Sequence, residues 1–348
     1  MTELTNELSS TLHRVLGLKY NNAPIEEVDA DFLIVDESSM IDIFLMNNLL
    51  SSVTERTRIL FVGDVNQLPS VGPGKILSDF ISCNKIKYVQ LKTIFRQAQG
   101  SLIVNNANRI ISGLTSDMPN GIELVNDDTK NFKYFPATDS SSIKLLITQT
   151  IDNYLSKGKN LNEICVLTAK RKGELGVENL NELFQDKYNK NPVEYENEEK
   201  GICFKKADKV IQTVNNYNLG VFNGFVGEIV DIEPFRIVKG RNVPAITVYY
   251  SNLGYNIVYE GEDISELELA YVLTIHKAQG SEYPYVISPI SLEQSVLLNR
   301  NLLYTDVTRA RKEFVLLGDI NAINKAILTE ISDEERVSRI SYKISTIC

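Results

Sequence analysis

The sequence predicts an α/β protein in which a parallel β-sheet carries polar residues at the ends of its strands. Two short apolar runs, residues 31–36 (DFLIVD) and 58–64 (RILFVGD), each end in an acidic residue. Between them, residues 40–53 place apolar side chains at helical spacing, and this strand–helix–strand order favours parallel pairing. The acids that follow the two strands are therefore expected at one sheet edge, where ligands bind in such folds.

A second α/β block is predicted further along the chain. Residues 163–168 read as a buried strand. Residues 115–140 are polar and contain Pro119, Gly121 and Pro136, so they are expected to form a surface excursion. Helices are predicted for residues 101–111, 142–154 and 177–188.

The pattern of residue types changes between residues 209 and 267, where short runs of strand-forming residues alternate with turns that contain Gly, Asn and Pro. This pattern predicts a small antiparallel barrel. Its strands are expected at residues 210–214, 227–232, 245–250 and 256–260. After the barrel, the sequence predicts a helix at 267–279, a strand at 285–288, a helix at 299–311, a strand at 313–318 and a charged tail at 323–348.

Composition narrows the class of protein. No apolar run approaches the roughly 20 residues that span a bilayer, and residues 1–8 lack the basic and apolar regions of a signal peptide, so a cytoplasmic protein is expected. The four cysteines are too dispersed for a zinc knuckle and are expected to be reduced. The net charge of −9 disfavours a nucleic-acid binder, although a cleft can be locally basic on an acidic body.

Three sites along the chain suggest nucleotide chemistry. Asp36-Glu37 follows the first strand, as expected of a carboxylate that holds Mg²⁺ beside one that polarises water. The alternative is that the pair only caps the next helix. Asp64 and Gln67 follow the second strand in a Pro/Gly loop, and Arg96 lies further on. An arginine at a domain junction could stabilise the charge that develops in phosphoryl transfer, or it could simply be solvated.

Five sequence segments, in the same order along the chain as in a known family, carry a specific resemblance. They resemble motifs II, III, IV, V and VI of superfamily 1 DNA helicases of the RecD-like, stand-alone branch. The segments are VDESSM (35–40), GDVNQLPSVGPG (63–74), IFRQ (94–97), TIHKAQGSE (274–282) and LLYTDVTRAR (302–311). Residues 11–14 (TLHR) resemble a DNA-contacting segment that precedes motif II in this family.

The resemblance implies a domain organisation. It implies two RecA-like parallel-sheet domains, the first incomplete, with an SH3-like β-barrel inserted in the second. The expected parts are residues 1–95 (first domain), 96–218 (second domain, first part), 219–267 (barrel), 268–322 (second domain, second part) and 323–348 (tail).

The resemblance also implies roles for individual residues. Asp36 would hold Mg²⁺, Glu37 would be the general base and Gln67 would sense the γ-phosphate of ATP. The arginine fingers would be Arg96 and Arg309, and Glu282 would lie near the ribose. Single-stranded DNA would be contacted by Thr11, His13, Thr274, His276 and Lys277. Two alternatives stay open: Thr11 and His13 could cap a helix, and Lys277 could pair with Glu282.

The sequence departs from the family in one respect. Neither of its two Gly-Lys pairs, Gly74-Lys75 and Gly158-Lys159, fits the phosphate-binding loop G-x-x-x-x-G-K-[ST]. The expectation is a truncated 5′–3′ DNA helicase that binds ATP weakly and is inactive alone, unless a second chain supplies the loop. The alternative is an ATPase-dead module that binds single-stranded DNA or a partner protein.

Overall fold

The computed structural model describes residues 9–18, 25–91, 101–238, 240–331, 338 and 340–347. The chain forms two compact units, Met1–Thr93 with Ile331–Cys348, and Ile94–Glu330. Within the described ranges, none of the helices combines the length and apolar character needed to cross a membrane.

The first unit is built on two parallel strands, β1 (Phe32–Val35) and β2 (Arg58–Phe61), in which Val35 aligns with Phe61. The predicted helix over 40–53 starts later than expected. Residues Ser38–Met40 form a 3-10 turn, η1, and α3 (Ile43–Ser52) begins where the Asp42 side chain accepts a hydrogen bond from the Leu45 amide. The other helices of this unit are α2 (Leu12–Val15), α4 (Ile76–Ser82) and α10 (Ile340–Ile347).

The two faces of the β1–β2 sheet have different surroundings. One face carries Val35 and Phe61 into a core that includes Leu49 of α3. Along the other face, the exposed side chains at alternate positions are Arg58, at the start of β2, and four large apolar ones. These are Phe32 (56% exposed), Ile34 (43%), Leu60 (46%) and Val62 (43%). Among the described residues, this face therefore lacks the cover that parallel sheets normally have on both sides.

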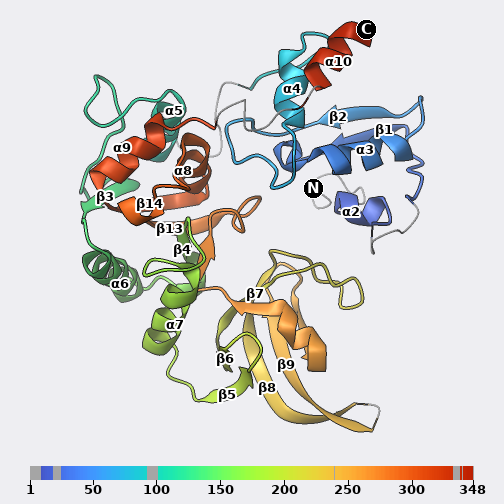
Figure 1. Ribbon diagram of the computed structural model, residues 1–348. Helices are drawn as coiled ribbons and strands as arrows, with labels where there is room; N and C mark the ends of the chain where they lie inside the picture. Colours follow the sequence, from blue (N-terminus) through green and yellow to red (C-terminus); the bar gives the residue numbers. More distant parts are fainter. Residues whose placement is uncertain are drawn as a thin grey trace. The chain divides into compact units, whose positions relative to one another are not determined.

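Residues 323–348, which the sequence analysis describes only as a charged tail, contain helical structure. The helix α9 (Ile320–Leu328) buries Ile323 and Ile327 in the second unit. Helix α10 lies against α4 in the first unit (Figure 1). Ile340 packs on the core, and the Ser338 hydroxyl is hydrogen-bonded to the Asp79 carboxylate. The signal was the apolar spacing of residues 320–328, which the surrounding charged residues masked.

The second unit contains a five-stranded, all-parallel sheet in the order β12-β4-β13-β14-β3. Helices α6 and α7 cover one face, and α5, α8 and α9 gather on the other (Figure 1). The strands are β3 (Phe132–Pro136), β4 (Ile164–Thr168), β12 (Val272–Thr274), β13 (Tyr283–Ile290) and β14 (Ala310–Gly318). The helices are α5 (Leu102–Ile111), α6 (Ser140–Ser156), α7 (Val177–Tyr188) and α8 (Arg300–Val307).

Two sequence predictions in this unit are wrong for the same reason. The supposed surface excursion at 115–140 contains β3, whose Phe132 is fully buried and aligned with Phe314 of β14. The supposed helix at 267–279 is instead two short strands, β11 (Leu267–Leu269) and β12, followed by a turn. Short strands at a sheet edge are stabilised by their neighbours, so their own sequence carries little periodicity.

The second sheet of this unit is antiparallel, with strand order β10-β9-β8-β7-β11, and it forms the inserted barrel. Its strands are β7 (Lys209–Gln212), β8 (Val226–Val238), β9 (Arg241–Tyr250), β10 (Tyr255–Glu260) and β11, with the hairpin β5 (Val193–Asn197) and β6 (Ile202–Lys205) alongside. Its core includes Phe204, Val210 and Tyr250. The sheet thus begins at Lys209, ten residues before the expected boundary at 219.

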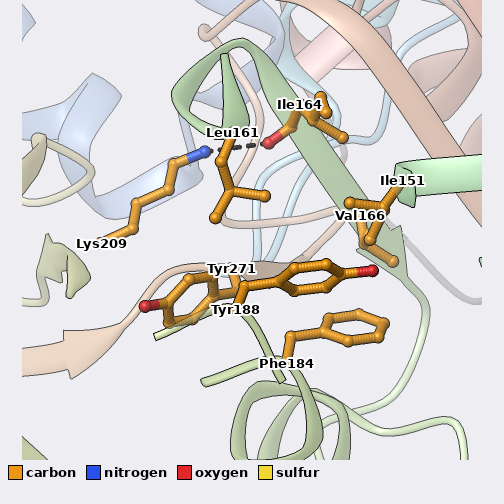
Figure 2. Close-up of a pocket in the computed structure, with 8 residues that line it drawn as sticks. All are labelled: Ile151, Leu161, Ile164, Val166, Phe184, Tyr188, Lys209 and Tyr271. Atoms are coloured by element: carbon orange, nitrogen blue, oxygen red, sulfur yellow. Dashed lines mark hydrogen bonds between the residues drawn. The ribbon is translucent and has the colours of Figure 1, made fainter. Parts of the chain in front are cut away.

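The barrel is fastened to the parallel sheet through consecutive residues at the start of β7. Asp208 accepts hydrogen bonds from Gln185 of α7 (2.6 Å), from Asn189 just after that helix (2.7 Å) and from the Tyr271 hydroxyl (2.9 Å). The Lys209 ammonium donates to the Ile164 carbonyl of β4 over 3.0 Å, and Figure 2 shows it in a pocket beside Tyr271. Burial lowers the pKa of Lys209. The barrel and the sheet are therefore joined by buried polar contacts.

Candidate functional site

The first part of the candidate site lies at the carboxyl ends of β1 and β2. Asp36 follows β1 and is exposed, and its carboxylate accepts a hydrogen bond from the Glu37 amide over 2.9 Å. Glu37 has φ 51° and ψ 38°, the left-handed conformation that costs an L-residue free energy. Such backbone strain persists where the surroundings hold it and is concentrated at functional positions.

The two strand ends are held together by local hydrogen bonds. The Ser38 hydroxyl and amide both donate to the Val62 carbonyl, over 2.7 and 2.9 Å. The loop after β2 carries the partly buried Gln67. It is held next to the β1 end because the Ser70 amide donates a hydrogen bond to the Ser39 carbonyl over 3.1 Å. At Gly72 an added Cβ would come within 2.0 Å of the Asp42 carboxylate, so a larger residue would displace the side chain that caps α3. The segments of motifs II and III therefore form one connected edge.

The side chains at this edge fit part of a Mg²⁺–nucleotide site. Among the described residues, no group of three or more His, Cys, Asp or Glu side chains could hold a metal ion. Asp36 would therefore contribute one carboxylate, with nucleotide phosphates and water completing the shell, which is how Mg²⁺ is commonly held. Glu37 and Gln67 would act next to it, on water and on the terminal phosphate.

The motif V segment follows the edge strand β12 in the second unit. Thr274 ends the strand beside Thr168 of β4, and its hydroxyl accepts a hydrogen bond from the Lys277 amide over 3.2 Å. His276 is exposed, and partial desolvation lowers its pKa. The alternative that Lys277 pairs with Glu282 is wrong, because its ammonium lies 2.7 Å from Glu268 of β11 instead.

Glu268 gathers two further cations that the sequence analysis missed. Arg171 approaches it to 3.0 Å and Lys200 to 3.9 Å, while Arg171 also meets Glu178 at 3.0 Å. The available signal was the basic run Lys170-Arg171-Lys172, which is separated from the end of β4 by one residue. Nothing in the sequence indicates that residues 171, 200 and 277 share one carboxylate.

Arg309, in the motif VI segment, lies at the end of α8 and is 3% exposed. Its guanidinium donates to the carbonyls of Thr305 (3.0 Å) and Ser281 (3.1 Å), next to Glu282. Glu282 in turn lies 3.8 Å from Arg311. The structure therefore brings the end of motif V and the arginine of motif VI together.

Asp306, one helical turn before Arg309, is a buried acid that sequence reasoning passed over. It is fully buried and accepts a hydrogen bond from the Ser288 hydroxyl of β13. Burial raises the pKa of Asp306 to about 8, against the opposing effects of Ser288 and the Arg309 charge. Its carboxyl group is consequently protonated over much of the neutral range.

The remaining predicted residues divide into two cases. The Thr11 hydroxyl accepts a hydrogen bond from the Arg14 amide over 3.4 Å, so Thr11 caps α2, and the exposed His13 lies in that helix. Capping leaves a DNA contact by either residue untested. Arg96 lies outside the described residues.

Family profiles match three parts of the chain. Residues 1–129 match a profile described as "AAA domain", and residues 269–317 match "UvrD-like helicase C-terminal domain". Residues 180–249 match "ATP-dependent RecD-like DNA helicase SH3 domain", which overlaps the antiparallel barrel.

Related sequences and structures agree with these profiles. The chain is 31% identical over 329 residues to the ATP-dependent RecD2 DNA helicase of Deinococcus radiodurans, covering 92% of this chain and 41% of that protein. It is 25% identical to the RecD subunit of the RecBCD enzyme of Buchnera aphidicola subsp. Schizaphis graminum, covering 91% and 60%. The chain thus spans about two fifths to three fifths of the length of these relatives.

Among solved structures, the fold resembles that of Bacteroides Pif1 bound to single-stranded DNA. The TM-score is 0.56 at 19% identity, and the match covers 97% of this chain and 84% of the Pif1 chain. The ordered motifs, the inserted SH3-like barrel and the related sequences point to the same group. The chain therefore belongs to the RecD-like family of superfamily 1 helicases and carries part of its motor core.

Proposed function

We propose that this chain carries the motif II to motif VI part of an ATP-driven DNA motor that moves 5′ to 3′ along single-stranded DNA. The observation that supports this most strongly is the pair of hydrogen-bonded strand ends that presents Asp36, Glu37 and Gln67 on one sheet edge. The direction of movement follows from membership of the family. The DNA-contacting residues would be Thr274, His276 and Lys277, with Thr11 and His13 in the other unit.

The proposal includes a requirement for residues beyond these 348. The chain contains no G-x-x-x-x-G-K-[ST] segment, so it offers neither the amides that cradle phosphates nor the lysine that accompanies them. Without that loop, Glu37 and Arg309 have no firmly held γ-phosphate to act on. These 348 residues by themselves should bind ATP weakly and not hydrolyse it.

The uncovered face of the β1–β2 sheet supports the second half of this proposal. Ile34 and Leu60 lie on an apolar face that is exposed among the described residues. A neighbouring strand–loop–helix segment, from the same polypeptide or a second one, would bury this surface and bring the phosphate-binding loop to the edge that carries Asp36.

The first test is ATP hydrolysis by the 348-residue chain with and without single-stranded DNA. The expected rate is no higher than that of Glu37→Gln. Turnover that DNA stimulates and Glu37→Gln abolishes would contradict the requirement for a further loop.

The second test adds a strand–loop–helix segment carrying G-x-x-x-x-G-K-[ST], fused upstream or supplied as a separate chain. DNA-stimulated hydrolysis should appear and should depend on Glu37. Ile34→Glu should block it, whereas Phe44→Glu, at an exposed position of α3, should not. Salt-sensitive DNA binding that stays without turnover would instead favour a DNA-binding module.

A further inference from the structure

We propose that Arg171 and Lys200 form, with Lys277, a binding site for the phosphate backbone of single-stranded DNA at the joint between motif V and the barrel. The inference rests on the proposed function and extends it to two residues that lie outside the family's motifs. The three cations come from separate segments: the turn after β4, the β5–β6 turn and the turn after β12.

One carboxylate organises the cluster. Glu268 of β11 is 13% exposed, and its oxygens approach Lys277 (2.7 Å), Arg171 (3.0 Å) and Lys200 (3.9 Å). Because Arg171 and Lys200 approach the same oxygen, Oε1, the two cations are close neighbours. The positive charges hold the pKa of Glu268 below its usual value despite its desolvation, so the group stays ionised.

The charge balance of the cluster favours an anionic ligand. Three cations meet Glu268 and Glu178, which leaves one positive charge in excess on a chain whose net charge is −9. Arg171 uses Nε and Nη2 for the two carboxylates, yet its side chain is 56% exposed. The Nη1 side of this exposed guanidinium is therefore the part available to a phosphate, which guanidinium groups bind well.

The geometry of the cluster is fixed by the joint beneath it. The Asn181 side chain of α7 donates to the carbonyls of Leu269 (3.2 Å) and Val272 (3.0 Å) and accepts from the Val272 amide (2.9 Å). This clamp spans the connection from β11 to β12, so Glu268 keeps its place relative to Thr274 and Lys277. The Lys200 ammonium also bonds to the Ser265 carbonyl, which ties the β5–β6 turn to the barrel.

A DNA strand that contacts motif V would therefore meet Arg171 and Lys200 on a surface already in position. Phosphate contacts of this kind carry no base preference, but they set where the strand runs. They also make binding depend steeply on salt, because each neutralised phosphate releases counterions.

The test measures how the affinity of the full chain for a dye-labelled oligodeoxythymidine of about 20 nucleotides varies with salt. Arg171→Gln with Lys200→Gln should reduce the slope of log affinity against log salt by about 1.4, or about 0.7 for each lost contact. The matched control is Lys187→Gln with Lys206→Gln, which removes the same charge from two lysines paired with Asp152 and Asp231.

The outcomes separate this inference from the proposed function. If Lys277→Gln weakens binding but the Arg171/Lys200 variant matches the control, motif V contacts DNA and the proposed extension is wrong. If the unaltered chain does not bind the oligonucleotide, the DNA-motor proposal and this inference both fail. A slope reduced only by the Arg171/Lys200 variant, and not by the control, supports the site.

Discussion

Arg309 donates a hydrogen bond from Nη1 to the carbonyl oxygen of Ser281 over 3.1 Å, which fixes the arginine of motif VI against the residue before Glu282. The same guanidinium donates to the Thr305 carbonyl over 3.0 Å. A residue expected to act on a phosphate is thus also a buried structural link between α8 and the start of β13. The two roles can be separated by measuring stability apart from activity.

Arg309→Ala should lower the free energy of unfolding of the second unit by about 1–3 kcal/mol, because the partly buried Ser281 carbonyl loses this donor and the Thr305 carbonyl keeps the Thr308 hydroxyl instead of both donors. Urea denaturation of the purified chain measures this. The control is Arg311→Ala, whose side chain is 63% exposed and whose loss should cost less than about 0.5 kcal/mol. Equal stability of the two variants would show that the Arg309 contacts contribute nothing.

Asp306 should make stability fall as pH rises. Its folded pKa of about 8 lies above the usual value of 3.8, so the folded state retains a proton that the unfolded state has lost. The stability that this proton provides is complete below about pH 4 and is lost as pH rises to about 8. Asp306→Asn, which cannot ionise, should be more stable than the unaltered chain by at least about 1 kcal/mol at pH 8. At about pH 4 the two proteins should have nearly the same free energy of unfolding.

The measurement is urea unfolding of both proteins between pH 4 and pH 9. A stability difference that does not change with pH would contradict the raised pKa. Ser288→Ala should leave the direction of the pH dependence intact, because burial is the main cause of the shift.

Asp208→Ala should loosen the joint between the barrel and the parallel sheet. It would remove one acceptor from the buried side chains of Gln185, Asn189 and Tyr271, at a cost of about 2–3 kcal/mol, although Gln185 and Asn189 also donate to backbone carbonyls. Hydrogen exchange should increase first in β7 and β11. Asp231→Ala, which removes an exposed partner of Lys206, should change stability by less than about 1 kcal/mol. Loss of stability without faster exchange in β7 would place the effect elsewhere.

Glu37→Gly should stabilise the first unit by about 1 kcal/mol, because glycine adopts φ near 51° without the steric cost that glutamate bears. Glu37→Gln removes the charge but keeps the Cβ, so it should not gain this stabilisation. Thermal unfolding of the three proteins tests the comparison. A glycine variant that melts below both others would mean that the glutamate side chain stabilises its own backbone conformation.

Segments with strong local patterns were predictable, whereas segments that depend on neighbours were not. The strands β1 and β4 are continuous apolar runs, and the helix α7 repeats apolar residues at helical spacing. Each can therefore be predicted from its own local sequence. The three-residue strand β12 is too short to show a period, and it forms because Val272 pairs with Val166. The edge strand β3 is stabilised in the same way by β14.

The sequence by itself determined which chemical groups follow each strand and in what order, since strand ends and motif spacing are local properties of the chain. The tertiary structure decided which groups meet. Lys277 faces Glu268 rather than Glu282, and Arg309 reaches Ser281, because side chains pair across strands and turns that the fold brings together. The tertiary structure also set the shifted pKa values. The pKa of Asp306 is raised and that of Lys209 is lowered because the folded chain removes both groups from water.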